Sequence, residues 1–577
     1  MSEVDLVIRG GTIVDGNGGE PFVADLAVRD GRIVALGEVA ARGCEEIDAT
    51  GLLVTPGFVD VHTHYDGQMT WENRTLPSAA HGVTTVLMGN CGVGFAPCRP
   101  EDRDTLIHLM EGIEDIPELV MAEGLPWNWQ TFPEYLDVVA SRPRDIDVAA
   151  QLPHSCLRVF VMGERGARGE AATADDLAQM TRLTEEAVRA GALGFGTSRT
   201  LFHRSSDGMA VPTKDAAEVE LDAIAQGLAR AGAGIIQVAL DFLDADTLES
   251  DIRMIGRVAK GSGRPASFNL VQLPQAPEAW RRALSTADEI VRSGVPMKAQ
   301  VLGRPTGLLL GLELSYNPFS LYPSYRKIAD LPLEQRVAEM RKPEVRARIL
   351  SESRTGEAIP TLDYLTHFDR MFPLGDPPNY EPPLESSIVA RAAREGRKPE
   401  EVVYDALLEQ DGHAIMMLAF ANYSDGDLEV VRHMLRDDNT IFGLGDGGAH
   451  YGMICDAGIP TYMLTHWTRD RTRGPRLGLA EVVRGLTRDP AELIGLLDRG
   501  VVAPGYKADL NLIDYDRLRL NSPSVIRDLP AGGKRIIQRA EGYVATIVNG
   551  VVTQRDGEPT DHLPGRLVRG PRVAPVQ

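Results

Sequence analysis

Residues 54–66, VTPGFVDVHTHYD, are the stretch from which the rest of this chain can be interpreted. A Pro-Gly turn precedes a two-residue alternation, in which His62 and His64 share one face of a predicted strand. Such neighbours lie about 6.5–7 Å apart, so at a strand end both imidazoles can converge on one metal ion. A bare His-x-His pair is more often an exposed strand, but the turn, Asp60 and the partners described below favour a metal site.

The chain has 577 residues, more than one ordinary core contains, so we expect a large domain with a smaller one. The net charge of -22 argues against nucleic acid or an anionic membrane as a partner, because either requires clustered Lys and Arg. We find no leader segment and no apolar run that could cross a bilayer. The five cysteines form no disulfide-like framework, which predicts a cytoplasmic protein. The sequence leaves open whether the chain forms a homo-oligomer.

The middle of the chain alternates between predicted strands and helices. Amphipathic helices are predicted at 173–190, 215–231, 245–260 and 277–293. The strands are predicted at 54–66, 82–92, 146–154, 191–198, 234–242, 264–272, 295–303 and 440–448. Repeated strand–helix units of this length imply a parallel sheet, and eight of them imply a closed (β/α)8 barrel of the TIM type.

Both ends of the chain contain short predicted strands with Asp-Gly or Asn-Gly hairpin signals. We therefore expect a small β-sandwich built from residues 1–53 and 499–577, the latter with a C-terminal tail, around a barrel over 54–498. Two insertions, over 100–145 and 304–438, follow predicted barrel strands. Loops after barrel strands lie over the catalytic face, so both insertions are predicted to be lids that supply substrate contacts.

The candidate chemistry gathers where these strands end, because the C-terminal ends of the strands carry the active site in such barrels. His62 and His64 are joined there by Cys91, in MGNCG, and by Asp446, in GLGDGGAH. Two imidazoles and a carboxylate with an open position form a catalytic metal site, and a thiolate at Cys91 favours zinc or another divalent ion. Such an ion lowers the pKa of a bound water to about 7. Asp446 is then the candidate base that passes the water proton to a leaving nitrogen.

Together these motifs resemble the amidohydrolase superfamily, and within it the N-acyl-D-amino-acid deacylase (D-aminoacylase) group. The resemblance runs nearly end to end, through RGGTIVDG, TPGFVDVHTH, GVTTVLMGNCG, GLGDGGAH and DPAELIGLLDRGVVAPGYKADLNLID. It implies that His62, His64 and Asp446 hold a metal ion and that Cys91 is the group's unusual cysteine ligand. It also implies hydrolysis of a small-molecule N-acyl amide to a carboxylate and an amine. A cyclic amide or imide substrate, and a degenerate barrel that binds without turnover, stay open as alternatives.

One departure from the family pattern concerns strands five and six, which usually end in histidines. This chain has no histidine between His203 and His367, and Gln237 and Asn269 lie near the expected places. The lysine that usually follows the strand-six histidine is also missing. A second ion would then have Cys91 as its only strong ligand, so we predict one metal ion per chain.

Further side chains near the predicted strand ends are candidate substrate contacts: His154, Arg158, Arg199, His203, Asn269, Arg304 and His450. A guanidinium suits the carboxylate of an N-acyl amino acid, because it can bind a carboxylate through two parallel hydrogen bonds. Ordinary ion pairs are the competing explanation for the arginines. For His154 the alternative role is a structural hydrogen bond, and for His203 it is a place in a loop without substrate contact. His450 lies four residues after Asp446 and could orient it, although a loop histidine is an equal alternative.

Overall fold

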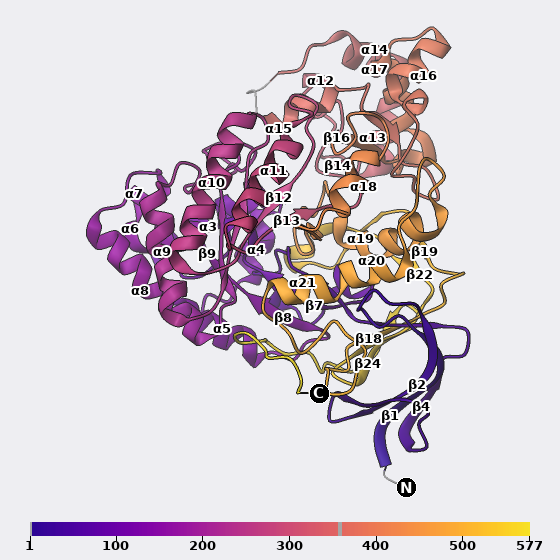
Figure 1. Ribbon diagram of the computed structural model, residues 1–577. Coiled ribbons are helices and arrows are strands. Elements are labelled where there is room, and N and C mark those ends of the chain that lie inside the picture. The colour runs from indigo at the N-terminus through magenta and orange to yellow at the C-terminus, as the bar shows by residue number, and fades with distance from the viewer. Residues whose placement is uncertain (1–2, 356–359, 577) are drawn as a thin grey trace.

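A computed structural model describes residues 3–355 and 360–576. At its centre is a parallel barrel, visible in Figure 1 around β7, β8, β12 and β13. The barrel consists of two sheets, β6-β7-β8 and β9-β10-β11-β12-β13-β17. They join on one side because β8 and β9 are consecutive pieces of one strand. On the other side a backbone bridge between Thr63 and Gly447 closes the barrel. The strands are β6 (Phe58–Asp60), β7 (Val83–Met88), β8 (Asp147–Ala150) with β9 (Leu152–Pro153), β10 (Gly194–Ser198), β11 (Ile235–Ala239), β12 (Ala266–Leu270), β13 (Met297–Val301) and β17 (Thr440–Phe442). Each lies inside a predicted strand, so the predicted barrel is confirmed.

Helices follow the strands and pack around the barrel (Figure 1). The best-defined are α6 (His154–Met162), α8 (Ala174–Ala190), α9 (Glu218–Ala231), α10 (Ala245–Ser262), α11 (Ala279–Arg292), α18 (Glu429–Leu435), α20 (Leu479–Leu486) and α21 (Arg488–Leu493). Helix α8 shows why they begin and end where they do. The Thr173 hydroxyl accepts from the backbone N–H of Asp176 while the Asp176 carboxylate accepts from that of Thr173, and Gly191 ends the helix.

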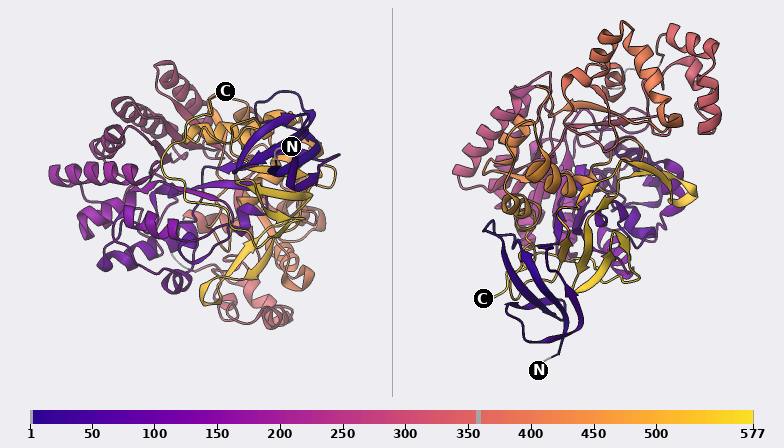
Figure 2. Two further views of the ribbon diagram at one scale, coloured as in Figure 1. Left: turned by 90° about the horizontal axis from the view of Figure 1, so that it is seen from below. Right: turned by 90° about the vertical axis from the view of Figure 1, so that its right-hand side faces the viewer.

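Strands from both ends of the chain form one nine-stranded sheet. Antiparallel pairing of β5 with β18 joins the two halves, which lie side by side in Figure 2 as indigo and yellow ribbons. The strands are β1 (Glu3–Ile13), β2 (Phe22–Arg29), β3 (Arg32–Gly37), β4 (Arg42–Asp48), β5 (Leu53–Pro56), β18 (Leu510–Ile513), β23 (Tyr543–Val548), β24 (Val551–Arg555) and β25 (Glu558–Pro559). Leu26, Val54 and Leu510 belong to its apolar core. The predicted β unit built from both termini is therefore present.

The first insertion contains α3 (Arg103–Glu114), α4 (Glu118–Gly124) and α5 (Phe132–Ser141). The second has a three-stranded antiparallel sheet and its own apolar core, which includes Leu310, Phe319 and Tyr404. Its elements are β14 (Thr306–Leu310), α12 (Pro323–Arg326), α13 (Leu333–Met340), α14 (Pro343–Ser351), α15 (Pro360–Asp363), β15 (Met371–Pro373), α16 (Ile388–Glu395), α17 (Pro399–Leu407) and β16 (Met416–Ala421). This part stands at the upper right in Figure 1.

Shorter elements complete the chain: α1 (Gln68–Trp71), α2 (Leu76–Ala79), α7 (Glu164–Ala167), α19 (Ile459–Tyr462), a π-helical segment (Met463–Asp470), β19 (Arg519–Leu520), β20 (Ser524–Arg527), β21 (Lys534–Ile537) and β22 (Ala540–Glu541). Within the described ranges, no helix combines the length and the apolar character that crossing a bilayer requires.

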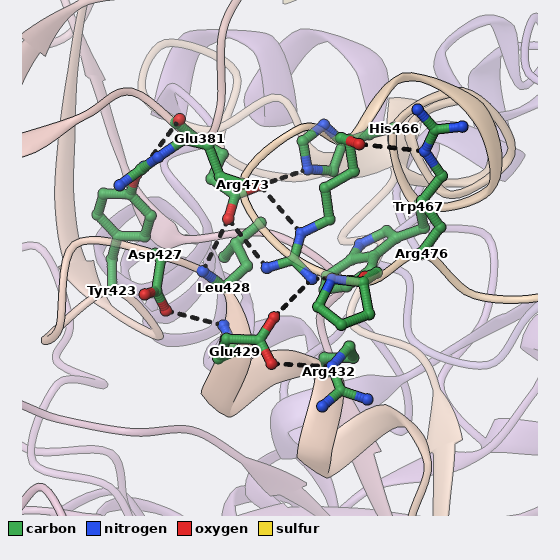
Figure 3. Close-up of polar contacts among 12 residues, drawn as sticks. Glu381, Tyr423, Asp427, Leu428, Glu429, Arg432, His466, Trp467, Arg473 and Arg476 are labelled. Carbon is green, nitrogen blue, oxygen red and sulfur yellow. Dashed lines mark hydrogen bonds and ion pairs between the residues drawn. The ribbon is translucent and has the colours of Figure 1, made fainter.

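A buried ion-pair network fastens the second insertion to the barrel. We call it the Arg471 network; Figure 3 shows its surroundings, and its members are Glu381, Glu429, His466 and Arg471. The Arg471 guanidinium donates to both carboxylate oxygens of Glu381, at 3.1 and 3.2 Å, and to Glu429 at 2.8 Å. His466 Nε2 lies 2.8 Å from Glu381. Glu381 and Glu429 belong to the insertion, whereas His466 lies in the π-helical segment and Arg471 directly follows it, so the network joins segments that are far apart in the sequence.

Candidate metal centre

The barrel closes where the end of β6 meets the loop after β17. The backbone N–H of Asp446 donates to the His62 carbonyl at 3.0 Å, and that of His64 donates to the carbonyl of the residue after Asp446 at 2.8 Å. Gly445 lies so close to Asp60 that a Cβ atom would come within 2.1 Å of the Asp60 carboxylate. These contacts hold two imidazoles and a carboxylate at one end of the barrel.

The structure brings together three of the predicted ligands. The ligand atoms of His62, His64 and Cys91 all lie within 4.8 Å of one another, and Cys91 Sγ is 3.4 Å from His62 Nε2. Four-coordinate zinc has bonds of about 2.0–2.3 Å, which places its ligand atoms roughly 3–4 Å apart. In the described ranges this is the one histidine, cysteine and carboxylate group of that kind. The side chains are thus spaced as the ligands of a single ion would be.

Asp446 stands against both imidazoles. Its Oδ1 atom is 3.3 Å from His62 Nε2 and 3.6 Å from His64 Nε2. Burial opposes ionisation of this carboxyl, but the close contact with His64 and the other neighbouring imidazoles outweigh it and hold the pKa of Asp446 below its usual range. On the other side of His62, Nδ1 lies 3.3 Å from Gln300 Oε1, so Nε2 is the atom that faces Asp446 and Cys91.

Glu114, the last residue of α3, is a site residue that the sequence analysis missed. It is 1% exposed. Its Oε1 lies 3.3 Å from His64 Nδ1 and its Oε2 lies 3.4 Å from His450 Nε2. The backbone N–H of His450 also donates to the Glu114 carbonyl. The first insertion therefore contributes a carboxylate directly behind a predicted metal ligand. The only sequence signal was its place in a predicted lid.

Several buried polar atoms at this end of the barrel have no hydrogen-bond partner. They are His64 Nδ1, His64 Nε2, Glu114 Oε1 and His450 Nδ1. Leaving a buried polar group unsatisfied costs about 1–3 kcal/mol, so a group of such atoms needs an explanation. A divalent ion bound to His64 Nε2 would satisfy that atom and strengthen the interaction of Nδ1 with Glu114. Two imidazoles and a thiol are also a donor set that suits zinc. The residues present therefore fit a bound ion.

Burial sets the protonation states of the predicted ligands. It lowers the pKa of His62 to about 4 and that of His450 to about 4, so both are neutral near pH 7. It raises the pKa of the Cys91 thiol to about 12. Burial also opposes protonation of His64, but Glu114 and Asp446 outweigh it and raise the pKa of this imidazole. A metal cation would favour the thiolate and the neutral imidazoles, because those are the forms that coordinate.

A cavity of about 230 Å³ adjoins the candidate metal centre. Three of the predicted substrate contacts line it: His203, Asn269 and His450. Both insertions also contribute to its wall, the first through Glu114 and the second through residues such as Tyr364. His203 Nδ1 lies 2.8 Å from Ser198 Oγ at the end of β10. The loops after several barrel strands therefore meet at this cavity.

Four of the predicted substrate contacts lie outside the described lining of this cavity. His154 and Arg158 are buried against Glu220, which lies 2.9 Å from His154 Nε2. The other two, Arg199 and Arg304, pair with Asp251 and Asp456 respectively. None of the four lines the described part of the cavity. Each is paired with a carboxylate of the protein, so a substrate carboxylate would have to displace an existing ion pair.

The ends of strands five and six carry carboxamides, as the sequence indicated. Gln237 on β11 accepts from Gln151 at 3.1 Å inside the barrel. Asn269 on β12 accepts from the backbone N–H of Leu240 at 2.6 Å and donates to its carbonyl at 3.2 Å. Both carboxamides are already engaged with the protein. They are neutral, so they are weaker metal ligands than imidazoles.

A wider hollow of about 1,000 Å³ opens at the opposite end of the barrel, around the starts of β12, β13 and β17. Its described lining contains no histidine or cysteine. Active sites in this fold lie at the C-terminal ends of the strands. The smaller cavity beside Cys91 is therefore the candidate active site, although the other hollow is larger.

Residues 45–554 match the Amidohydrolase family. The chain belongs to the amidohydrolase family. As a member it is a metal-dependent amidohydrolase, a hydrolase of carbon–nitrogen bonds other than peptide bonds, as the motif pattern indicated. The N-acyl-D-aspartate deacylase of Alcaligenes xylosoxydans xylosoxydans is 39% identical over 219 residues, which cover 38% of this chain and 40% of that protein. The N-acyl-D-glutamate deacylase of the same organism is 25% identical and aligns over 99% of this chain and 97% of its own length.

A solved structure shares the whole fold. The N-acyl-D-glutamate deacylase of Bordetella bronchiseptica, which was determined with zinc and a phosphonate inhibitor, superposes with a TM-score of 0.65 and 22% identity. The match covers 98% of this chain and all of that one. The predicted architecture, a barrel with a β domain built from both termini, is thus confirmed by an independent protein.

Proposed function

We propose that this chain hydrolyses a small N-acyl amide with the help of one divalent metal ion, most simply zinc. The observation that carries the proposal is the convergence of His62, His64 and Cys91 beside the ionised Asp446. The deacylase names of the relatives support an acylated amine as the substrate class. The five cysteines are all free, which supports the predicted cytoplasmic location.

His62, His64 and Cys91 would hold the ion, which when bound would supply an activated water molecule and a polarised amide carbonyl. Asp446 accepts the proton of that water and then donates it to the nitrogen of the departing amine. The low pKa of Asp446 keeps the carboxylate ionised and ready to act as the base. Burial favours the neutral form of His450, so this imidazole can exchange hydrogen bonds with the substrate without adding a charge.

Glu114 is assigned a positioning role. It contacts Nδ1 of His64, the side of the ring that faces away from Asp446. A carboxylate at this nitrogen fixes the ring orientation and makes the opposite nitrogen a stronger ligand, as it does in many metal sites with histidine. Because α3 carries Glu114, the orientation of the His64 ring depends on how the first insertion packs against the barrel.

The proposal includes one ion per chain. Strands five and six supply carboxamides that are already hydrogen-bonded, so a second ion would have only Cys91 as a strong ligand. Element analysis of the purified chain after dialysis should give one zinc equivalent. Two tightly held ions would contradict the stoichiometry and would require ligands in addition to His62, His64 and Cys91.

The decisive test of function is turnover by the zinc-loaded chain on a panel of simple N-acyl amides. We expect release of the amine that is lost on chelation and restored by zinc. Asp446→Asn should bind zinc and ligand without turnover, whereas Asp215→Asn, at an exposed carboxylate far along the chain, should behave like the wild type. A zinc-loaded chain that binds amides but leaves them intact would favour a non-catalytic barrel.

A further inference from the structure

Part of the cavity wall is apolar and aromatic. Phe202, Tyr364 and Phe420 line it in a row: the rings of Phe202 and Phe420 are stacked with centroids 6.3 Å apart, and those of Tyr364 and Phe420 are 5.5 Å apart. Phe202 follows barrel strand four, whereas the other two belong to the second insertion. The insertion therefore builds a surface that would bind a hydrocarbon group by removing it from water.

Histidines are the only basic side chains in the described lining of the cavity. Of the described residues that line it, none is an arginine or a lysine, and three are carboxylates: Glu114, Asp446 and Asp456. A carboxylate that enters a buried site without a cationic partner loses its hydration and gains nothing in return.

The basic residues nearest to the cavity wall are already engaged. Arg304 is 2% exposed, donates to Asp456 at 3.0 Å, and lies over the ring of Tyr380. Arg204, which follows a lining residue, donates to the carbonyl of Gly208 at 3.0 Å. Arg304 Nη1 has no hydrogen-bond partner, but Arg304 does not line the described part of the cavity, so a substrate carboxylate could reach it only if Asp456 and the wall moved. This cavity therefore differs from a carboxylate-binding site, in which an accessible guanidinium binds the anion through two parallel hydrogen bonds.

A bound divalent ion would not give the cavity a net positive charge. The two positive charges of a divalent cation would be matched by the Cys91 thiolate and the Asp446 carboxylate. Glu114 lies between two imidazoles and Asp456 is paired with Arg304. No net positive charge is left for an anionic ligand, and no unpaired carboxylate faces the cavity to select a cationic one.

We propose that the substrate of this site is a small uncharged amide without an α-carboxylate, whose apolar part lies on the wall formed by Phe202, Tyr364 and Phe420. The inference rests on the proposed amide hydrolysis and names its substrate class. A cavity of about 230 Å³ is slightly below the roughly 300–1,000 Å³ typical of small-molecule sites, so the substrate is small. Water adds across the carbon–nitrogen bond to give a carboxylate and an amine, and no other reactant is needed.

The test compares two amides that differ only in the carboxylate. N-acetyl-3-methylbutylamine is N-acetylleucine without its α-carboxylate, and both enantiomers of N-acetylleucine serve as the anionic partners. With the zinc-loaded full chain, kcat/KM for the uncharged amide should exceed that for either N-acetylleucine by about tenfold or more. Equal or higher kcat/KM for an N-acetylleucine would overturn the inference.

A binding experiment separates this inference from the proposed function. Calorimetric titration of the zinc-free wild-type chain, which keeps the Asp446 carboxylate and lacks the ion needed for turnover, should show tighter binding of the uncharged amide. If that preference appears but the wild type hydrolyses none of the compounds, the proposed function is wrong and the substrate class stands. If the anionic compounds bind equally well, or if no compound binds, the substrate class is wrong.

A substitution in the wall gives an independent check. Val271 is a half-buried lining residue just after β12. Val271→Lys adds the missing cation, so binding should shift toward N-acetylleucine, whereas Val271→Met adds length without charge and should leave the preference for the uncharged amide. If Val271→Lys kept the same preference as Val271→Met, the lack of a cation would not explain the selectivity.

Discussion

Two clusters of buried charge in this chain contrast sharply. In the Arg471 network each charged side chain has a partner: Arg471 donates to Glu381 and Glu429, and His466 contacts Glu381. The candidate metal centre is also buried, with His64 and Glu114 each 1% exposed, yet both have buried atoms without a hydrogen-bond partner. In the network the satisfied charges fasten two parts of the fold, whereas the unsatisfied atoms at the candidate metal centre leave positions that a ligand could fill.

The difference teaches how to separate a structural charge cluster from a functional one. Both contain a histidine beside carboxylates, so residue types alone do not distinguish them. Hydrogen-bond satisfaction does, because an unliganded site keeps free the atoms that its ligand will use. Breaking one partner should therefore unfold the chain in the first cluster and affect metal binding or turnover in the second.

The largest expected effect is on turnover, at the metal centre. Asp446→Asn keeps the shape of the side chain but removes the base, so kcat should fall by about 10²–10⁴-fold while thermal unfolding changes little. Steady-state kinetics and thermal unfolding of the zinc-loaded variant check this. Comparable kcat in variant and wild type would remove Asp446 from the mechanism.

The next largest effect is on stability, in the Arg471 network. Arg471→Met leaves Glu381 buried without its main partner, so the free energy of unfolding should fall by about 3–5 kcal/mol. Urea denaturation measures this change. The control is Arg168→Met, which removes an exposed ion pair and should change stability by about 1 kcal/mol or less. Equal effects of the two substitutions would mean that the network does not fasten the insertion.

A moderate effect is expected on metal binding when the positioning carboxylate is removed. Glu114→Gln should weaken zinc binding by about 10–100-fold, because the ring of His64 loses its anionic partner. Competition with a chelator gives the affinity, and the visible spectrum of the cobalt-substituted chain reports a changed ligand field. Glu118→Gln, at an exposed position on α4, is the matched control. An unchanged spectrum and affinity in Glu114→Gln would exclude the positioning role.

The smallest expected effect is a pH dependence of stability. Burial opposes ionisation of Glu381, but His466 and Arg471 outweigh it and lower the pKa below the ordinary value of 4.5. A lowered folded-state pKa stabilises the fold above pH 4.5, and this contribution is lost as the pH falls through the folded pKa. Denaturation between pH 6 and pH 3 should thus show a shallower decline for Glu381→Gln than for the wild type. Parallel curves would show that Glu381 is not the group that titrates.

Local pattern was enough to predict the barrel strands and the convergence of the four candidate ligands at one end of the barrel. The alternation around His62 and His64 is a property of neighbouring residues, and a barrel places all strand ends at one rim, so Cys91 and Asp446 could be added from their positions in the strand order. The presence of carboxamides at strands five and six could be predicted from the sequence in the same way. None of these predictions required knowledge of how distant segments dock.

Tertiary docking decided the rest. Glu114 lies 50 residues after His64, on a helix of the first insertion, and nothing in EGIED marks it as the partner of a histidine. Arg304 follows a barrel strand as a substrate-binding arginine would, but the fold pairs it with Asp456. The charge and the free volume of the cavity depend on which side chains are already paired. That pairing is set by contacts across the whole chain, so no local stretch of sequence could reveal it.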